Sequence, residues 1–74
     1  MKNLNDLKLN EEAIIALVND SNLKRRLMDI GFVKGAKVKL LLKNFGDNMR
    51  AYQIKNTIIA LRVNDAKTVI IEES

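Results

Sequence analysis

The chain has 74 residues, and 13 Lys or Arg against 9 Asp or Glu give it a formal net charge of +4. It contains no cysteine, histidine or proline, which excludes disulfides and zinc sites built from Cys and His. A chain of this length is expected to form a single domain, residues 1–74, whose small core must hold by packing alone.

The sequence carries no apolar segment of the kind found in signal peptides or membrane spans. Its longest purely apolar run, Ala13–Val18, is far too short to cross a bilayer. Together with the absence of cysteine, this predicts a cytoplasmic protein with no membrane insertion. The basic excess favours acidic proteins, anionic lipid surfaces or nucleic acid as partners.

The N-terminal part of the chain predicts a short anchor and then a buried strand. Residues 4–9 carry leucines in a polar segment, which favours a turn or a short 3₁₀ helix. The apolar run at 12–18 is typical of a central strand, or of one covered by the helix that follows. Asn19, Asp20 and Ser21 then supply turn and helix-capping side chains.

Residues 21–30 predict a helix with one apolar and one basic side. The apolar face has the spacing i, i+4, i+7 and carries Leu23, Leu27 and Ile30. Gly31 is expected to end the helix as its C′ residue, where a left-handed backbone would cost any other residue about 1–2 kcal/mol. Gly35 is interpreted in the same way, as a backbone requirement rather than a ligand site.

The rest of the chain predicts four more strands separated by tight turns. Residues 36–43 alternate between apolar and basic side chains, which is the pattern of a half-buried strand. The inner face is expected to carry Ala36, Val38, Leu40 and Leu42, and the outer face Lys37, Lys39 and Lys43. Further strands are predicted at 49–55, 57–61 and 69–72, with one helical turn at 64–67. The hairpin turn at 55–57 places Asn56 where a left-handed backbone is needed.

Five short strands and one short helix favour an all-β fold with a small helical content. The expected architecture is a five-stranded, partly open antiparallel barrel of SH3-like topology, because closure removes exposed sheet edges. The main alternative is the OB-fold, which has its helix between the third and fourth strands. Here the helix lies between the first and second strands, which argues against that alternative.

Several short motifs follow one another along the chain: LKRRLMDIG at 23–31, VKGAKV at 33–38, GD at 46–47, IALR at 59–62 and DAKTVII at 65–71. In this order and spacing the sequence resembles the ferrous iron transport protein A family, FeoA, over nearly its whole length. The resemblance implies an SH3-like accessory domain that supports or regulates Fe²⁺ uptake by contacting the cytosolic part of FeoB, a membrane transporter. The family commonly has Pro-Gly where this chain has Leu9-Asn10, and a glycine at Asn56. Asn tolerates the same left-handed backbone.

Nothing in the sequence predicts catalysis or a bound cofactor. There is no histidine or cysteine to act as general acid, base or nucleophile, and no GxxxxGK[ST] motif for a nucleotide. Iron sites favour histidine and carboxylate ligands, and the acidic residues are not predicted to share a face. Any role with transition-metal ions is therefore expected to be indirect, with an all-carboxylate site as the alternative.

A partner-binding face is predicted around the end of the helix, at Lys24, Arg25, Met28, Phe32 and Val33. The basic residues lie away from the predicted core, and an exposed methionine is an adaptable contact residue. Two other arginines, Arg26 and Arg62, are expected to hold loops through hydrogen bonds to backbone carbonyls.

Two other functions stay open. One is nucleic-acid binding by the basic strand face, which the absence of aromatic side chains among its lysines disfavours. The other is a detached regulatory module of a metal-dependent repressor. Weak self-association through a sheet edge is a further expectation.

Overall fold

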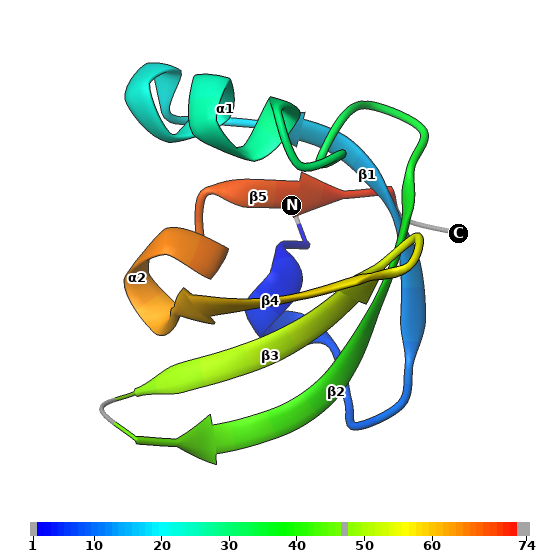
Figure 1. Cartoon of the computed structure of the whole chain (residues 1–74), viewed down its shortest axis with the longest axis vertical. Helices are drawn as coiled ribbons and strands as arrows, with labels where there is room; N and C mark the ends of the chain where they lie inside the picture. Colours follow the sequence, from blue (N-terminus) through cyan, green and yellow to red (C-terminus); the bar gives the residue numbers. More distant parts are fainter. Residues whose placement is uncertain (1, 47, 73–74) are drawn as a thin grey trace.

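Five strands form one antiparallel sheet in the order β4-β3-β2-β1-β5, and this sheet curves around the core (Figure 1). The computed structural model describes residues 2–46 and 48–72 and, at 44 and 45, the backbone alone. In chain order the elements are η1 (Leu4–Asp6), β1 (Glu12–Val18), α1 (Ser21–Met28), β2 (Lys37–Phe45), β3 (Met49–Ile54), β4 (Thr57–Arg62), α2 (Val63–Ala66) and β5 (Val69–Ile71). Figure 1 shows β1 and β2 along one side of the barrel, α2 on the opposite side and α1 across the top, while β5 pairs with β1.

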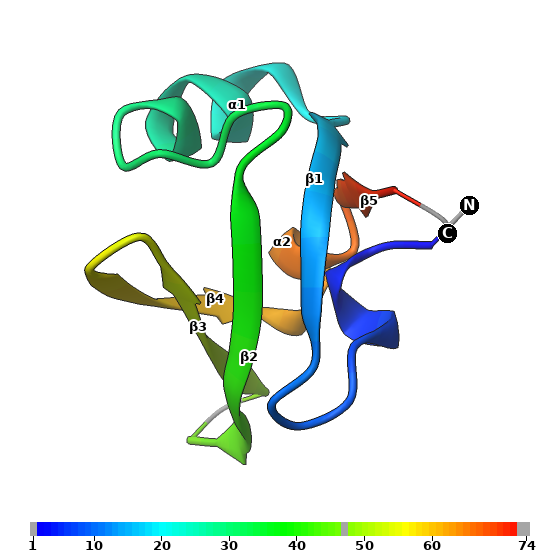
Figure 2. The same ribbon diagram turned by 90° about the vertical axis from the view of Figure 1, so that its right-hand side faces the viewer.

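The predicted fold class is confirmed. The five strands lie where the apolar pattern placed them, with boundaries shifted by at most two residues, and α1 lies between β1 and β2. Figure 2 shows β1 and β2 side by side from outside the barrel. The barrel is partly open, because β4 and β5 stand at the two ends of the strand order.

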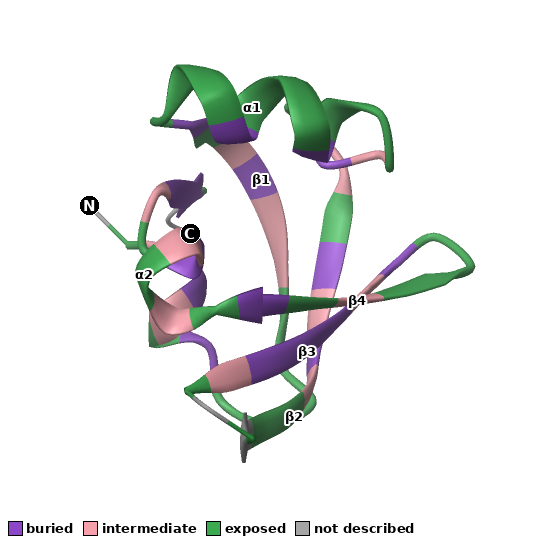
Figure 3. Ribbon diagram, turned by 60° about the vertical axis from the view of Figure 1, so that its left-hand side comes forward, coloured by how far each residue is buried: buried purple, intermediate pink, exposed green. Residues whose placement is uncertain are grey.

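The core fills the space between the curved sheet and α1. Figure 3 shows buried residues concentrated on β3, on β5 and on the side of α1 that faces the sheet. The largest fully buried side chains are Tyr52, Phe32, Leu4, Ile15, Leu40, Ile54, Val38 and Val69. Packing of these side chains is the main source of stability in a chain that has no disulfide.

A β-bulge in β2 changes which residues face the core. Leu40 pairs with Tyr52 and Leu42 pairs with Ala51, so two residues of β2 advance against one residue of β3. Leu40 is fully buried, as predicted, but Leu42 is 54% exposed. The prediction that Leu42 faces the core is wrong, because strict alternation does not survive the extra residue.

The left-handed residue of the β3–β4 hairpin is Lys55, with φ +53°, and not the predicted Asn56. β3 ends at Ile54, one residue before the predicted boundary, so the two-residue turn begins at Lys55. Tight hairpin turns take a positive φ at their first central residue. Asn10 does take the left-handed backbone that the resemblance implies, with φ +68°.

Residues 2–7, the N-terminal strap, cover the outer edge of β5. The amide of Ile71 donates a hydrogen bond to the carbonyl of Lys2 at 3.0 Å, and an isolated antiparallel bridge joins the strap to β5. Leu4 and Leu7 of the strap are buried in the core. The strap therefore closes one of the edges that an open sheet would expose.

Two side chains of β3 hold the strap from inside the barrel. The guanidinium of Arg50 donates one hydrogen bond to Oδ1 of Asn5 at 3.0 Å and another to the carbonyl of Leu7 at 3.1 Å. The hydroxyl of Tyr52 donates to the carbonyl of Leu4 at 3.4 Å. These bonds tie oxygens of the strap to buried side chains of β3, and the bond from Arg50 gives the buried carbonyl of Leu7 a partner.

In the part of the chain that the structure describes, the arginine that donates to a loop carbonyl is not one of those predicted. Arg26 and Arg62 are exposed, whereas Arg50 is only 6% exposed and donates to the backbone. Alternation along β3 places Arg50 on the same face as Tyr52 and Ile54, so the strand pattern carried a signal for its burial.

Replacing the buried guanidinium should loosen the strap. Arg50→Lys keeps the charge but loses the two-pronged donor, so we expect the free energy of unfolding to fall by about 1–3 kcal/mol. Arg62→Lys, the same change at an exposed position, should alter stability by no more than about 0.5 kcal/mol. Urea unfolding of both variants gives the comparison, and equal effects would show that Arg50 does not anchor the strap.

Burial raises the pKa of Tyr52 from 10.0 to about 12, and the neighbouring Arg50 guanidinium partly offsets the rise. The neutral phenol is therefore favoured in the folded state, and its contribution to stability is complete below pH 10 and is lost as the pH rises toward 12. Tyr52 is the chain's one tyrosine and there is no tryptophan, so ultraviolet absorbance reports this phenol alone.

We expect the absorbance of the folded chain to titrate near pH 12 and that of the urea-unfolded chain near pH 10. Tyr52→Phe should remove this component of the alkaline loss of stability. A folded-state midpoint at the ordinary tyrosine value would contradict the burial of the hydroxyl.

Candidate functional site

Four of the five predicted contact residues line one hollow between α1 and β1, the α1–β1 groove, with a volume of about 400 Å³. The predicted residues among its lining are Lys24, Met28, Phe32 and Val33. β1 contributes residues 15–18, and the loop after α1 adds Lys34. The structure therefore brings four of the predicted residues together in one groove, and the sequence did not predict the strand that completes it.

The floor of the α1–β1 groove is core and its rim is exposed apolar surface. Ile15 and Phe32 are fully buried at the floor, whereas Leu17, Met28 and Val33 at the rim are 45%, 49% and 37% exposed. The rim thus exposes three large apolar side chains around one concavity. Such clustering is typical of sites that bind another molecule.

Phe32 does not belong to the exposed face that was predicted. Its side chain is part of the core cluster, because the chain turns back toward the sheet at Gly31. The amide of Phe32 donates to the carbonyl of Leu27 at 2.9 Å, and that of Gly31 donates to Met28 at 3.1 Å. This pair of bonds is a Schellman motif, and Leu27 and Phe32 both belong to the core cluster.

The same motif makes α1 shorter than predicted and frees Ile30. α1 begins after the N-cap Asp20, whose carboxylate accepts from the amides of Asn22 and Leu23, and it ends at Met28. Leu23 and Leu27 are buried as predicted, but Ile30 lies beyond the helix and is 37% exposed. The helix is thus fixed to the core by two leucines, and its flanks stay open.

The loop after α1 is pinned to β1 beside the groove. Gly35 has φ +90°, and its amide donates to the carbonyl of Ile15 at 2.8 Å. The amide of Ile15 in turn donates to the carbonyl of Ala36 at 2.9 Å. These bonds hold Val33 and Lys34 in position at one end of the α1–β1 groove.

Two basic side chains accompany the apolar rim. Lys24 of α1 and Lys34 of the following loop line the α1–β1 groove. Arg25 is exposed and lies outside it, in an adjoining hollow that shares Lys24 and Met28. Sequence reasoning missed Leu17 and Lys34. An apolar strand residue is normally assigned to the core, and a lone lysine carries no pattern.

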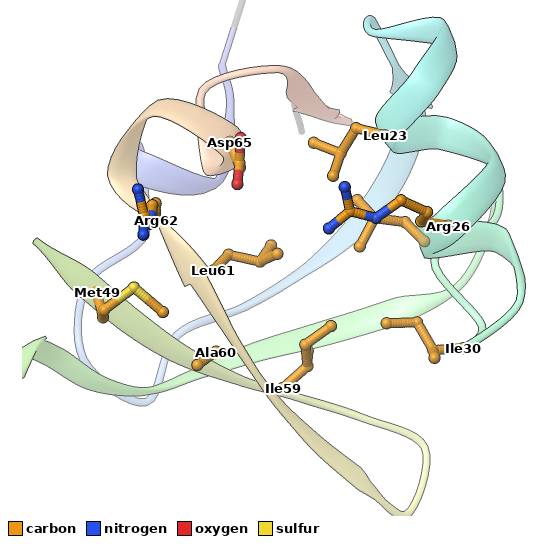
Figure 4. Close-up of a pocket in the computed structure, with 10 residues that line it drawn as sticks. Leu23, Arg26, Ile30, Met49, Ile59, Ala60, Leu61, Arg62 and Asp65 are labelled. Carbon is orange, nitrogen blue, oxygen red and sulfur yellow. The ribbon is translucent and has the colours of Figure 1, made fainter.

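A second hollow lies on the other flank of α1, facing the edge strand β4. Figure 4 shows this α1–β4 groove, with Arg26 reaching into it from α1 and Ile30 facing Ile59 across it. Its volume is about 330 Å³, and its lining includes both arginines that were predicted to hold loops, Arg26 and Arg62. The sequence did not predict this groove.

Self-association through a sheet edge stays a prediction.

Residue types that ligate metals are not clustered in the part of the chain that the structure describes. In residues 2–46 and 48–72, no three His, Cys, Asp or Glu side chains gather where they could hold a metal ion. Within the same residues, no helix is long and apolar enough to span a membrane. The α1–β1 groove, which is lined by apolar side chains and two lysines, can bury an apolar side chain of another molecule.

A five-stranded barrel with a helix between its first two strands and a groove on each flank of that helix is an SH3-like domain. The family model described as the FeoA domain matches residues 2–73. The chain belongs to the FeoA family, and with it to the accessory proteins of ferrous iron transport.

The relatives agree with this assignment. An Fe(2+) transport protein A of Campylobacter jejuni is 31% identical over 67 residues, which span 89% of this chain and 90% of that protein. The crystal structure of Stenotrophomonas maltophilia FeoA complexed with zinc, described as a prokaryotic SH3 domain protein, has a TM-score of 0.87 and 32% identity, covering 97% and 91% of the two chains. The solution structure of FeoA from Chlorobium tepidum has a TM-score of 0.85 and 30% identity, covering 95% and 68%.

The turn that shapes the α1–β1 groove should depend on the backbone of Gly31, which has φ +104°. A Cβ at Gly31 would meet only the Lys55 side chain, at 3.8 Å, so the cost of a side chain is backbone strain rather than collision. Gly31→Ala should lower the free energy of unfolding by about 1–2 kcal/mol. Chemical synthesis with D-alanine at this position supplies the matched control, because a D-residue favours positive φ. Equal destabilisation by both alanines would rule out backbone strain as the cause.

Proposed function

We propose that this chain supports ferrous iron uptake by binding the cytosolic part of a FeoB-type transporter through the α1–β1 groove. It would act in the cytoplasm as an accessory protein, with no catalysis and no cofactor of its own. Membership of the FeoA family supports the iron-transport role. The observation that carries the choice of surface is the exposed apolar rim of the groove, formed by Leu17, Met28 and Val33.

The energetic argument for this surface rests on burial of its rim. Fully burying a large aliphatic side chain is worth about 1.5–3 kcal/mol relative to leaving it exposed. Met28 and Leu17 are each about half exposed, so a partner that covers both regains a substantial part of that energy. A methionine also adapts its shape to the side chain it contacts.

The charge around the groove describes the segment that would fit it. Lys24 and Lys34 line the groove and Arg25 stands next to it. An apolar side chain flanked by acidic residues would match this surface. Peripheral charges mainly raise the association rate and make it depend on salt, so we expect binding to weaken as salt rises while the apolar contribution persists.

The test is an NMR titration of the labelled chain with the isolated GTP-binding domain of FeoB from the same organism, with and without nucleotide. We expect shift changes centred on Leu17, Met28 and Val33. Leu17→Ala/Met28→Ala should weaken binding at least about tenfold, since it removes aliphatic surface from the centre of the contact.

The control is a matched pair of aliphatic residues on another face. Leu42 and Ile58 are 54% and 66% exposed, and neither lines the α1–β1 groove. Leu42→Ala/Ile58→Ala should leave the affinity for the FeoB domain within about twofold. If both double variants bind equally well while folded, the groove is not the contact surface.

A further inference from the structure

The outer face of the sheet carries a second surface, which is basic rather than apolar. Strand pairing aligns Glu12, Lys39, Gln53 and Ile58 across β1, β2, β3 and β4. The residues that alternate with this row, Val38, Leu40, Tyr52 and Ile54, are fully buried. The row therefore points away from the core. Figure 2 looks onto the β1 and β2 part of this face.

Lysines dominate the hollow in this face. Lys37, Lys39 and Lys55 line a depression of about 360 Å³, together with Gln53 and one carboxylate, Glu12. Three ammonium groups against one carboxylate leave a local excess of positive charge. A concave surface lined by one sign of charge raises the local concentration of the opposite charge.

Two exposed aliphatic side chains accompany these lysines. Ile58 stands at the β4 end of the aligned row and is 66% exposed. Leu42 is 54% exposed and pairs with Ala51, which in turn pairs with Ala60 of β4. The β2 bulge brings Leu42 to this face instead of the core. The outer sheet face, defined here as Lys37, Lys39, Leu42, Lys55 and Ile58, thus combines cations with exposed hydrocarbon.

We propose that the outer sheet face adsorbs peripherally to an anionic lipid bilayer. Lysines near such a membrane are attracted by its negative surface potential, and aliphatic side chains can enter the boundary between headgroups and acyl chains. The lysines of this face match the anionic headgroups of a bilayer, and its aliphatic side chains match the acyl chains. Single-stranded nucleic acid would match the lysines but would need aromatic side chains for stacking. Tyr52, the aromatic residue of β3, is buried on the inner side.

The outer sheet face and the α1–β1 groove have no lining residue in common. Adsorption would hold the chain next to a membrane transporter. Only this biological purpose of adsorption rests on the proposed function. The adsorption itself requires only lipid. The two surfaces can therefore be tested separately.

The test is co-sedimentation of the full chain with phosphatidylcholine vesicles that contain about 30% phosphatidylserine, compared with vesicles of phosphatidylcholine alone. We expect binding to the anionic vesicles that weakens with salt. Each lysine lost from the face should reduce the partition coefficient about fivefold, so Lys37→Gln/Lys39→Gln should reduce it about 25-fold. Leu42→Ser/Ile58→Ser should also weaken binding, since it removes the exposed hydrocarbon.

The matched control is Lys24→Gln/Arg25→Gln, which removes the same charge from α1. Retained vesicle binding by this control, with loss in Lys37→Gln/Lys39→Gln, supports the proposal. Equal loss in the two charge variants would show attraction to net charge alone and overturn it. Binding to a single-stranded oligonucleotide but not to vesicles would make the face a nucleic-acid site instead. A negative result with vesicles would not bear on FeoB binding, because the NMR titration with the FeoB domain contains no lipid. A negative NMR titration would likewise not bear on vesicle binding.

Discussion

The fold depends on the attachment of the N-terminal strap to β3. A sheet this short cannot enclose a core by itself, and the strap closes its β5 edge while burying Leu4 and Leu7. Arg50 and Tyr52 reach the strap from inside the barrel through hydrogen bonds to backbone and side-chain oxygens. A buried cation that donates to backbone carbonyls is costly to leave unpaired. The same bonds that satisfy Arg50 therefore also fix where the strap lies.

Because the strap closes one side of the barrel, most of α1 stays at the surface. Only Leu23 and Leu27 of the helix are buried, so each flank of α1 borders a groove. The Schellman motif at Gly31 then returns the chain to the sheet and uses Phe32 as core. The apolar rim of the α1–β1 groove follows from this geometry, because Met28 and Val33 lie on either side of the turn while Phe32 is taken inside.

The two proposed surfaces divide the molecule by chemistry. The α1–β1 groove offers apolar side chains and two lysines, which suits a protein segment. The outer sheet face offers a lysine-lined hollow with scattered aliphatic residues, which suits a charged, deformable surface. One small barrel can present both surfaces. Alternation along each strand puts every second side chain on the outer sheet face, and α1 covers only part of one end of the sheet, which leaves the α1–β1 groove beside it.

The sequence alone determined the five strands and the helix between the first two, because local periodicity and turn chemistry encode these features. Tertiary structure decided the rest. The β2 bulge turned Leu42 outward, and a strand ending one residue early put the left-handed turn at Lys55. Phe32 lies in the core, and Leu17 lies at the rim of the α1–β1 groove. The outward position of Leu42 and the exposure of Leu17 depend on which residue of another strand lies opposite, and that pairing is set by packing across the whole chain rather than by neighbours in sequence.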